Sequence, residues 1–167
     1  YQEASKEMKR VQLEMGGKNP LIVLDDADLD LAVDLAIRGG YGQAGQACTA
    51  TSRVIVQSSI AEEFTRRLVE EVKKLKVGNG LDPDVDMGPQ VSEAELSSTL
   101  EAIQQALSDG ATLLCGGDVP KTTETQHGFF VQPTVLGNVK PGTKIALEEV
   151  FGPVIAIMEV ETVEEAI

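Results

Sequence analysis

The alternation of short apolar runs with helical patterns is the feature that most restricts how this chain can fold. Residues 21–24 form an apolar run between a proline and two aspartates, which is typical of a short buried strand. Apolar residues then recur at helical spacing over 29–37, with Asp28 as a candidate N-cap and a glycine pair at 39–40 that predicts the helix end. The segment therefore predicts a strand followed by a helix.

The same pairing recurs further along the chain. Residues 52–57 predict a β-branched strand, and 60–78 predict a helix whose apolar side chains line one face. After a turn-rich segment, Ser92 and Glu95 have the spacing of a capping box, and they begin a further predicted helix that ends at Gly110. These elements follow the order expected of consecutive strand and helix units.

The last part of the chain completes the pattern. Residues 111–117 and 128–139 predict two strands joined by a polar loop, 153–160 predict another strand, and 162–167 predict the first turn of a helix. Strands that alternate with helices favour an α/β fold with a largely parallel sheet flanked by helices, in one domain over residues 1–167. Because one helical turn is not stable alone, we expect the sequence to be a segment of a longer protein.

The charge of the chain excludes several classes of partner. The sequence has 27 acidic and 14 basic residues and a formal net charge of -13, so its surface repels phosphate backbones and anionic lipids. No apolar stretch approaches the roughly 20 residues of a membrane span, and the first residues lack the apolar region of a signal peptide. We therefore expect a cytoplasmic protein that binds neither nucleic acid nor membranes.

The two cysteines, Cys48 and Cys115, are widely separated and lack the spacing of a disulfide framework or a metal site. Cys115 follows apolar residues in a predicted strand, which indicates a packing role. Cys48 lies in "GQACTA", among small and polar residues, in the kind of loop that carries catalytic side chains in α/β folds. A lone cysteine is more often a buried filler, so its residue type alone leaves both interpretations open.

Two acidic segments are further candidates for chemistry. Glu14 lies between apolar residues and directly before a glycine pair, so it is either a partly buried general base or a solvated surface charge. The segment "EEVFGPV" over 148–154 places two acids and an aromatic residue before a strand, which by itself is a weak signal. His127 lies in a polar loop and argues against a cysteine-histidine pair, and the glycine pairs do not match a dinucleotide fingerprint.

Taken together and in this order, "LEMGGKNP", "GQACTA" and "EEVFGPV" resemble the aldehyde dehydrogenase superfamily, and the resemblance extends over nearly the whole chain. Members of this family oxidise an aldehyde to a carboxylic acid with NAD or NADP. The resemblance implies that Cys48 is the nucleophile that forms a thiohemiacetal and then a thioester, and that Glu14 activates the water that hydrolyses it. It also implies that the fold is most of the thiol-bearing catalytic domain, truncated at both ends.

The resemblance further assigns residues to the cofactor. It implies that Glu149 binds the nicotinamide ribose hydroxyls, that Phe151 lies against the nicotinamide ring, and that the backbone near Met15 is close to the carboxamide. We expect the Rossmann-type domain that binds the rest of NAD(P), and the C-terminal part with the oligomer interface, to lie outside this sequence. The expected partners are therefore a small-molecule aldehyde and further copies in a homo-oligomer, and we expect little turnover by residues 1–167 alone.

The choice of substrate and reaction retains alternatives. The motifs resemble the bacterial semialdehyde and betaine-aldehyde branches of the family. Ala47, however, adds no positive charge beside the nucleophile, whereas several family members for acidic semialdehydes have an arginine in or near this loop. The identity of the aldehyde substrate is therefore left open. NAD and NADP are distinguished at the adenosine 2'-position, which contacts the domain outside this sequence. A non-catalytic scaffold of the same fold is one alternative. Another is an enzyme that passes the acyl group to phosphate or coenzyme A, against which Glu14 argues.

Overall fold

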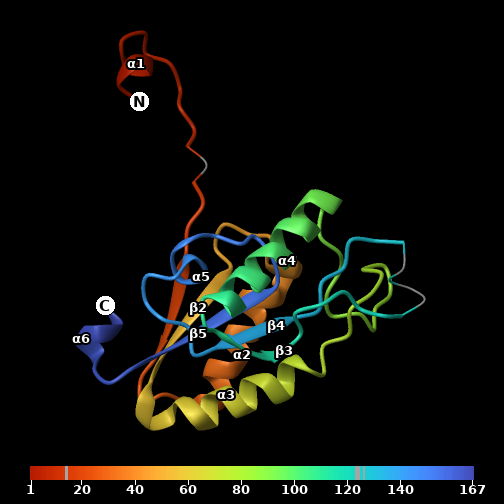
Figure 1. Ribbon diagram of the computed structural model, residues 1–167. Coiled ribbons are helices and arrows are strands. Elements are labelled where there is room, and N and C mark those ends of the chain that lie inside the picture. Colours follow the sequence, from red (N-terminus) through yellow and green to blue (C-terminus); the bar gives the residue numbers. More distant parts are fainter. Residues whose placement is uncertain (14, 123–124, 126) are drawn as a thin grey trace.

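The computed structural model describes residues 1–13, 15–122, 125 and 127–167. One five-stranded sheet with the order β1-β2-β5-β4-β3 forms its centre (Figure 1). The strands are β1 (Asn19–Val23), β2 (Thr51–Gln57), β3 (Thr112–Cys115), β4 (Thr134–Gly137) and β5 (Val154–Val160). All neighbouring strands pair in parallel except β3, which is antiparallel to β4. The predicted α/β fold class with a largely parallel sheet is therefore confirmed.

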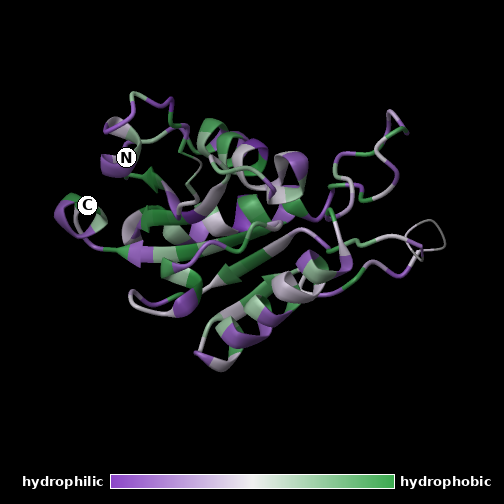
Figure 2. Cartoon of the chain, turned by 90° about the horizontal axis from the view of Figure 1, so that it is seen from above, coloured by the Kyte–Doolittle hydropathy of each residue, from purple (hydrophilic) through white to green (hydrophobic). Residues whose placement is uncertain are grey.

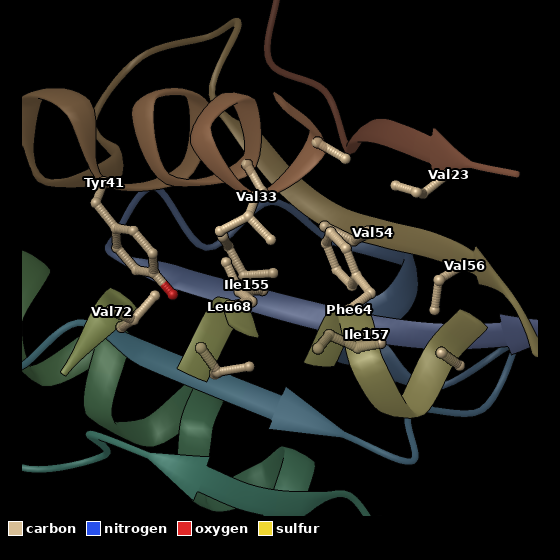
Figure 3. Packing of buried hydrophobic residues seen from close by; sticks show 14 of the residues in the cluster. Val23, Val33, Tyr41, Val54, Val56, Phe64, Leu68, Val72, Ile155 and Ile157 are labelled. Carbon is tan, nitrogen blue, oxygen red and sulfur yellow. The ribbon is translucent and has the colours of Figure 1, made fainter. Parts of the chain in front are cut away.

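Helices cover both faces of the sheet and enclose two apolar clusters. The helices are α1 (Gln2–Ser5), α2 (Leu29–Tyr41), α3 (Ser58–Val72), α4 (Glu93–Ser108), α5 (Lys144–Leu147) and α6 (Val163–Ala166). Helices α2 and α3 pack over Ile155 and Ile157 of β5, as Figure 3 shows. Helices α4 and α5 pack over Ala156 and Met158 of the same strand. Because side chains alternate along a strand, β5 contributes to both clusters.

Figure 2 shows that the strands are largely apolar, whereas the helices and loops combine apolar and hydrophilic residues. Residues 1–13 extend away from the sheet and its helices (Figure 1). Among the described residues, no helix combines the length and the apolar composition that crossing a membrane requires.

The helix starts follow the capping signals of the sequence. Asp28 Oδ1 accepts hydrogen bonds from two backbone N–H groups of the first turn of α2, at 3.0 and 3.1 Å. Ser92 Oγ accepts one from the Glu95 N–H at 3.3 Å, and Thr162 Oγ1 accepts one from the Glu165 N–H at 3.3 Å. Each side-chain oxygen pairs with an N–H group that has no partner within its helix.

The predicted end of α2 at the glycine pair 39–40 is wrong, because the helix continues to Tyr41. Gly40 lies against β5, and a Cβ atom there would come 2.5 Å from Ile155 Cδ1. The missing side chain therefore allows close packing of helix on sheet rather than ending the helix. This packing also buries the Tyr41 ring over the core.

Two predicted elements are longer than the observed ones. Helix α3 ends at Val72 rather than at residue 78, because the backbone of Lys76 pairs with the turn-rich loop: the Met87 N–H donates to the Lys76 carbonyl at 3.1 Å. Of residues 128–139, only Thr134–Gly137 form a strand. The Gln132 N–H donates instead to a loop carbonyl at 2.9 Å, so this backbone is satisfied outside the sheet.

Candidate active site

The three sequence motifs converge because each directly precedes a strand of the same parallel sheet. Residues 15–18 lead into β1, 45–50 lead into β2, and 148–153 lead into β5. These strands are neighbours in the order β1-β2-β5 and run in parallel, so their first residues lie at one edge of the sheet. Segments that are far apart in the sequence therefore line one region.

The loop that carries Cys48 starts with an unusual backbone. After α2 the chain forms a short 3-10 turn over Gly42–Gly45, in which Gln43, Ala44 and Gly45 have φ values of 52°, 56° and 70°. Residues other than glycine rarely adopt such backbone angles. Three of them in succession reverse the chain direction between α2 and β2.

Cys48 itself lies in a tight turn and is exposed to solvent. The Ala50 N–H donates to the Ala47 carbonyl at 2.9 Å, which closes the turn around the cysteine. Asn19, the first residue of β1, donates through Nδ2 to the carbonyls of Cys48 at 2.7 Å and of Ala50 at 3.2 Å. The thiol is therefore presented from a turn that is bonded to the edge of the sheet.

Two glutamines attach the first half of the loop to the segment that precedes α4. Gln46 donates to the Pro89 carbonyl at 3.2 Å and accepts a hydrogen bond from the Val91 N–H at 2.8 Å. The buried Gln90 donates to the Ala44 carbonyl at 3.1 Å. These bonds account for the unusual backbone, because they hold it from outside the loop.

The Cys48 loop and the segment before β5 are in direct contact. A Cβ atom at Gly45 would lie 2.5 Å from the carbonyl carbon of Gly152, so only glycine fits there. A small cleft opens between the two segments, and its lining includes Ala47 and Ala50 beside the thiol and Glu149 and Phe151 across from it. The structure thus places the loop that carries Cys48 against the segment that carries Glu149 and Phe151.

Glu149 and Phe151 offer two different surfaces in this cleft. Glu149 is exposed, and its carboxylate lies so close to the Gly16 backbone that a side chain at Gly16 would collide with it. Phe151 has a left-handed φ of 52° and is 37% exposed. A carboxylate accepts hydrogen bonds from hydroxyl groups and an exposed ring packs on a planar group. The two residues thus offer a hydrogen-bond acceptor and an apolar surface in the same cleft.

Lys18 adds a buried amine near this carboxylate. Its Nζ has no hydrogen-bond partner among the residues that the structure describes. Burial, and then repulsion from Arg53, lowers the pKa of Lys18 to about 8, while the Glu149 carboxylate acts in the opposite direction. The charge of this amine therefore changes in the slightly alkaline range.

The remaining predicted site residues have different outcomes. Met15 is 75% exposed, on the extended stretch before β1. Glu14 lies outside the described residues, so its role as general base stays a prediction. Cys115 packs against the core and burial raises the pKa of its thiol, which agrees with the predicted packing role. Asn19 and Gln90, which bond the Cys48 loop, were not predicted from the sequence. One available signal was that each of the three motifs directly precedes a strand, which indicates that the motifs meet at one edge of the sheet.

The sequence matches the aldehyde dehydrogenase family over residues 1–167. The chain belongs to this family. Among curated relatives, the chain is 49% identical to α-ketoglutarate semialdehyde dehydrogenase of Haloferax volcanii, over 100% of this chain and 34% of that protein. It is 45% identical to betaine aldehyde dehydrogenase of Cereibacter sphaeroides, again over 100% of this chain and 34% of the relative.

A solved structure has the same fold as this chain. Betaine aldehyde dehydrogenase from Staphylococcus aureus in complex with NAD+ superposes with a TM-score of 0.93 at 44% identity, over 99% of this chain and 33% of that one. The chain thus spans about one third of the length of the relatives it matches.

Proposed function

We propose that this chain supplies the nucleophile and one side of the cofactor site of an enzyme that oxidises an aldehyde to a carboxylic acid with NAD or NADP. The observation that carries the proposal is the cleft in which the exposed Cys48 loop faces Glu149 and Phe151. The relatives named for semialdehyde and betaine aldehyde oxidation support it, as does the NAD+ complex of the related structure.

In the first step, the Cys48 thiolate attacks the aldehyde carbonyl carbon. A carbon–sulfur bond forms while the carbonyl electron pair moves to oxygen, which gives a thiohemiacetal. Ala47 and Ala50, which flank Cys48 in the turn, have only methyl side chains and so add little bulk near the thiol. By resemblance to the family, the Cys48 backbone N–H donates a hydrogen bond to the negatively charged oxygen.

Cofactor binding in this proposal uses the segments on either side of the thiol. Glu149 would accept hydrogen bonds from the ribose hydroxyls, Phe151 would lie against the nicotinamide, and the backbone near Met15 would approach the carboxamide. When bound, NAD(P) supplies an acceptor for the hydride of the aldehyde carbon. Cys48 then holds the acyl group as a thioester. Glu14 removes a proton from water, which attacks the thioester, releases the carboxylic acid and restores the thiol.

The experiment measures the intact protein with α-ketoglutarate semialdehyde and with betaine aldehyde, in the presence of NAD or NADP. We expect NADH or NADPH and the free carboxylic acid to form with at least one aldehyde, without added phosphate or coenzyme A. We expect Glu14→Gln to retain single-turnover cofactor reduction and to lower the steady rate by about 100-fold or more, because hydrolysis loses its base.

Two results would contradict this proposal. No cofactor reduction by the intact protein with any aldehyde would support the scaffold alternative. A requirement for coenzyme A or phosphate, with no effect of Glu14→Gln, would support acyl transfer to those acceptors.

We also propose that residues 1–167 form most of a catalytic domain and turn over aldehydes poorly without the remainder of a full-length enzyme. By resemblance, a second oxyanion donor and most of the cofactor contacts lie outside this chain, and the loss of one such donor costs about 100-fold in other enzymes. Steady NADH formation by residues 1–167 alone, at the rate of the intact protein, would contradict this.

A further inference from the structure

We propose that Asn19 is a positioning residue for the Cys48 thiol. Its Nδ2 donates to the Cys48 carbonyl at 2.7 Å and to the Ala50 carbonyl at 3.2 Å. These two carbonyls lie on either side of Thr49, so one amide group bonds two residues of the turn that presents the thiol. The inference rests on the proposed function, because positioning matters only if Cys48 attacks a bound aldehyde.

Asn19 is itself held firmly by the sheet. It is the first residue of β1 and pairs with Thr51 of β2, and its carbonyl accepts a hydrogen bond from Ser52 Oγ at 3.4 Å. The register between β1 and β2 shifts between Asn19 and Pro20. Its short side chain therefore extends from backbone that the neighbouring strand anchors, which makes it a rigid support for the loop.

The bonds that anchor the loop are divided between its two halves. Gln46 and Gln90 attach the first half to the segment before α4. The turn over 47–50 has its own Ala50 to Ala47 bond and receives the two bonds from Asn19. Without Asn19, the part of the loop that contains the nucleophile would retain its local turn but lose this connection to β1.

The expected consequence is a loss of geometry rather than of thiol reactivity. Asn19 bonds backbone carbonyls and not the sulfur, so its removal should leave attack by Cys48 on a small freely diffusing reagent largely unchanged. Acylation requires the sulfur at the carbon of a bound aldehyde, and a misplacement of about 1 Å can lower such a rate by about 100-fold. We therefore expect acylation to fall by about 10- to 100-fold.

The test uses Asn19→Asp in the intact protein, because aspartate has nearly the same size and cannot donate. Asn138→Asp is the matched control: Asn138 Nδ2 also donates to a backbone carbonyl, that of Gly110 at 3.1 Å, away from the Cys48 loop. Three quantities are measured for each variant. These are single-turnover NADH formation with betaine aldehyde or α-ketoglutarate semialdehyde, the rate of Cys48 alkylation by iodoacetamide relative to Cys115, and backbone hydrogen exchange over 43–51.

We expect Asn19→Asp to slow single-turnover NADH formation by about 10-fold or more, with Cys48 alkylation within about two-fold of wild type and faster exchange over 43–51. Asn138→Asp should match wild type in all three. NADH formation within about two-fold of wild type, or a parallel rise in Cys115 alkylation that indicates general loosening, would overturn the proposal. Asn19→Ala, which introduces no carboxylate, is subject to the same criteria if Asn19→Asp does not fold.

Failure of the proposed function gives a different result from failure of this inference. A wild-type protein that reduces no cofactor with either aldehyde overturns both the proposed function and the catalytic role of Asn19. If the wild-type protein is active but Asn19→Asp leaves backbone hydrogen exchange over 43–51 unchanged, the positioning role alone is overturned.

Discussion

The Cys48 loop and the end of β3 place the two cysteines of this chain in opposite surroundings. Cys48 is exposed on a turn that Asn19 bonds to the sheet, and its neighbours Ala47 and Ala50 line a cleft with Glu149. Cys115 is half-buried, packs against the core, and has a thiol pKa that burial raises. Because burial disfavours the thiolate, the two sites differ in access and in charge although the residue type is the same.

The two cysteines also differ in the backbone that holds them. A regular strand satisfies its backbone through its neighbours and directs side chains into the core. The Cys48 loop instead uses a reversed backbone and bonds from distant amide side chains, which leaves the thiol free. The difference therefore lies in the backbone and its supports, and three substitutions or measurements test it.

The largest expected effect separates the two cysteines directly. Cys48→Ser should lower NADH formation by the intact protein by about 10⁴-fold or more, since the covalent intermediate is lost. Cys115→Ser is the matched control, and we expect it to retain the wild-type rate within a few-fold. Comparable losses in both variants, measured as kcat/KM with the better aldehyde, would show that the comparison does not describe function.

A smaller effect is expected from the backbone that supports Cys48. Gly45→Ala places a side chain on a residue with a left-handed φ of 70° and brings its Cβ into collision with Gly152. The collision should lower the free energy of unfolding by about 1–3 kcal/mol, in addition to the effect of the φ angle. Gly142→Ala is the control, because Gly142 has a φ of 87° with no atom within 4 Å of the added Cβ. Thermal unfolding of the intact protein and single-turnover NADH formation should both be more affected by Gly45→Ala, and equal effects would contradict the close approach.

The smallest expected effect concerns the pH dependence of Cys115. Its raised pKa means that alkylation by iodoacetamide should begin at higher pH than for the same thiol in the denatured chain, whose ordinary pKa is about 8.5. The corresponding stability is fully present below about pH 8.5 and is lost as the pH rises through the raised pKa of the folded thiol. Alkylation rates of Cys115 measured from about pH 7 to about pH 10 in native and denatured protein test this. Superimposed profiles would contradict burial of this thiol.

Much of the fold could be predicted from the sequence because the signals are local. The apolar runs before and after α2, the Asp28 and Ser92 caps, and the alternation of strands and helices all depend on residues within a few positions of one another. The errors arose where a tertiary contact overrode a local signal. The glycine pair at 39–40 predicts a helix end, whereas in the structure Gly40 allows α2 to pack closely on β5.

The candidate site, too, could be predicted from the sequence only in part. The motif around Cys48 and the segment with Glu149 could be recognised from residue order, and both precede strands. Their convergence depends on the sheet order β1-β2-β5, which no local pattern contains. The role proposed for Glu14 rests on the resemblance to the family, because its sequence setting alone leaves a general base and a surface charge both open.

By itself, then, the sequence determined the class of fold, the positions of most strands and helices, and which cysteine lies in a loop, because helical and strand periodicity are properties of neighbouring residues. Only the tertiary structure decided that Asn19 bonds the Cys48 turn, that Gly45 contacts Gly152, and that Glu149 lines a cleft together with Ala47 and Ala50. These contacts join residues far apart in the chain, and their geometry exists only once the parallel strands have aligned their first residues at one edge.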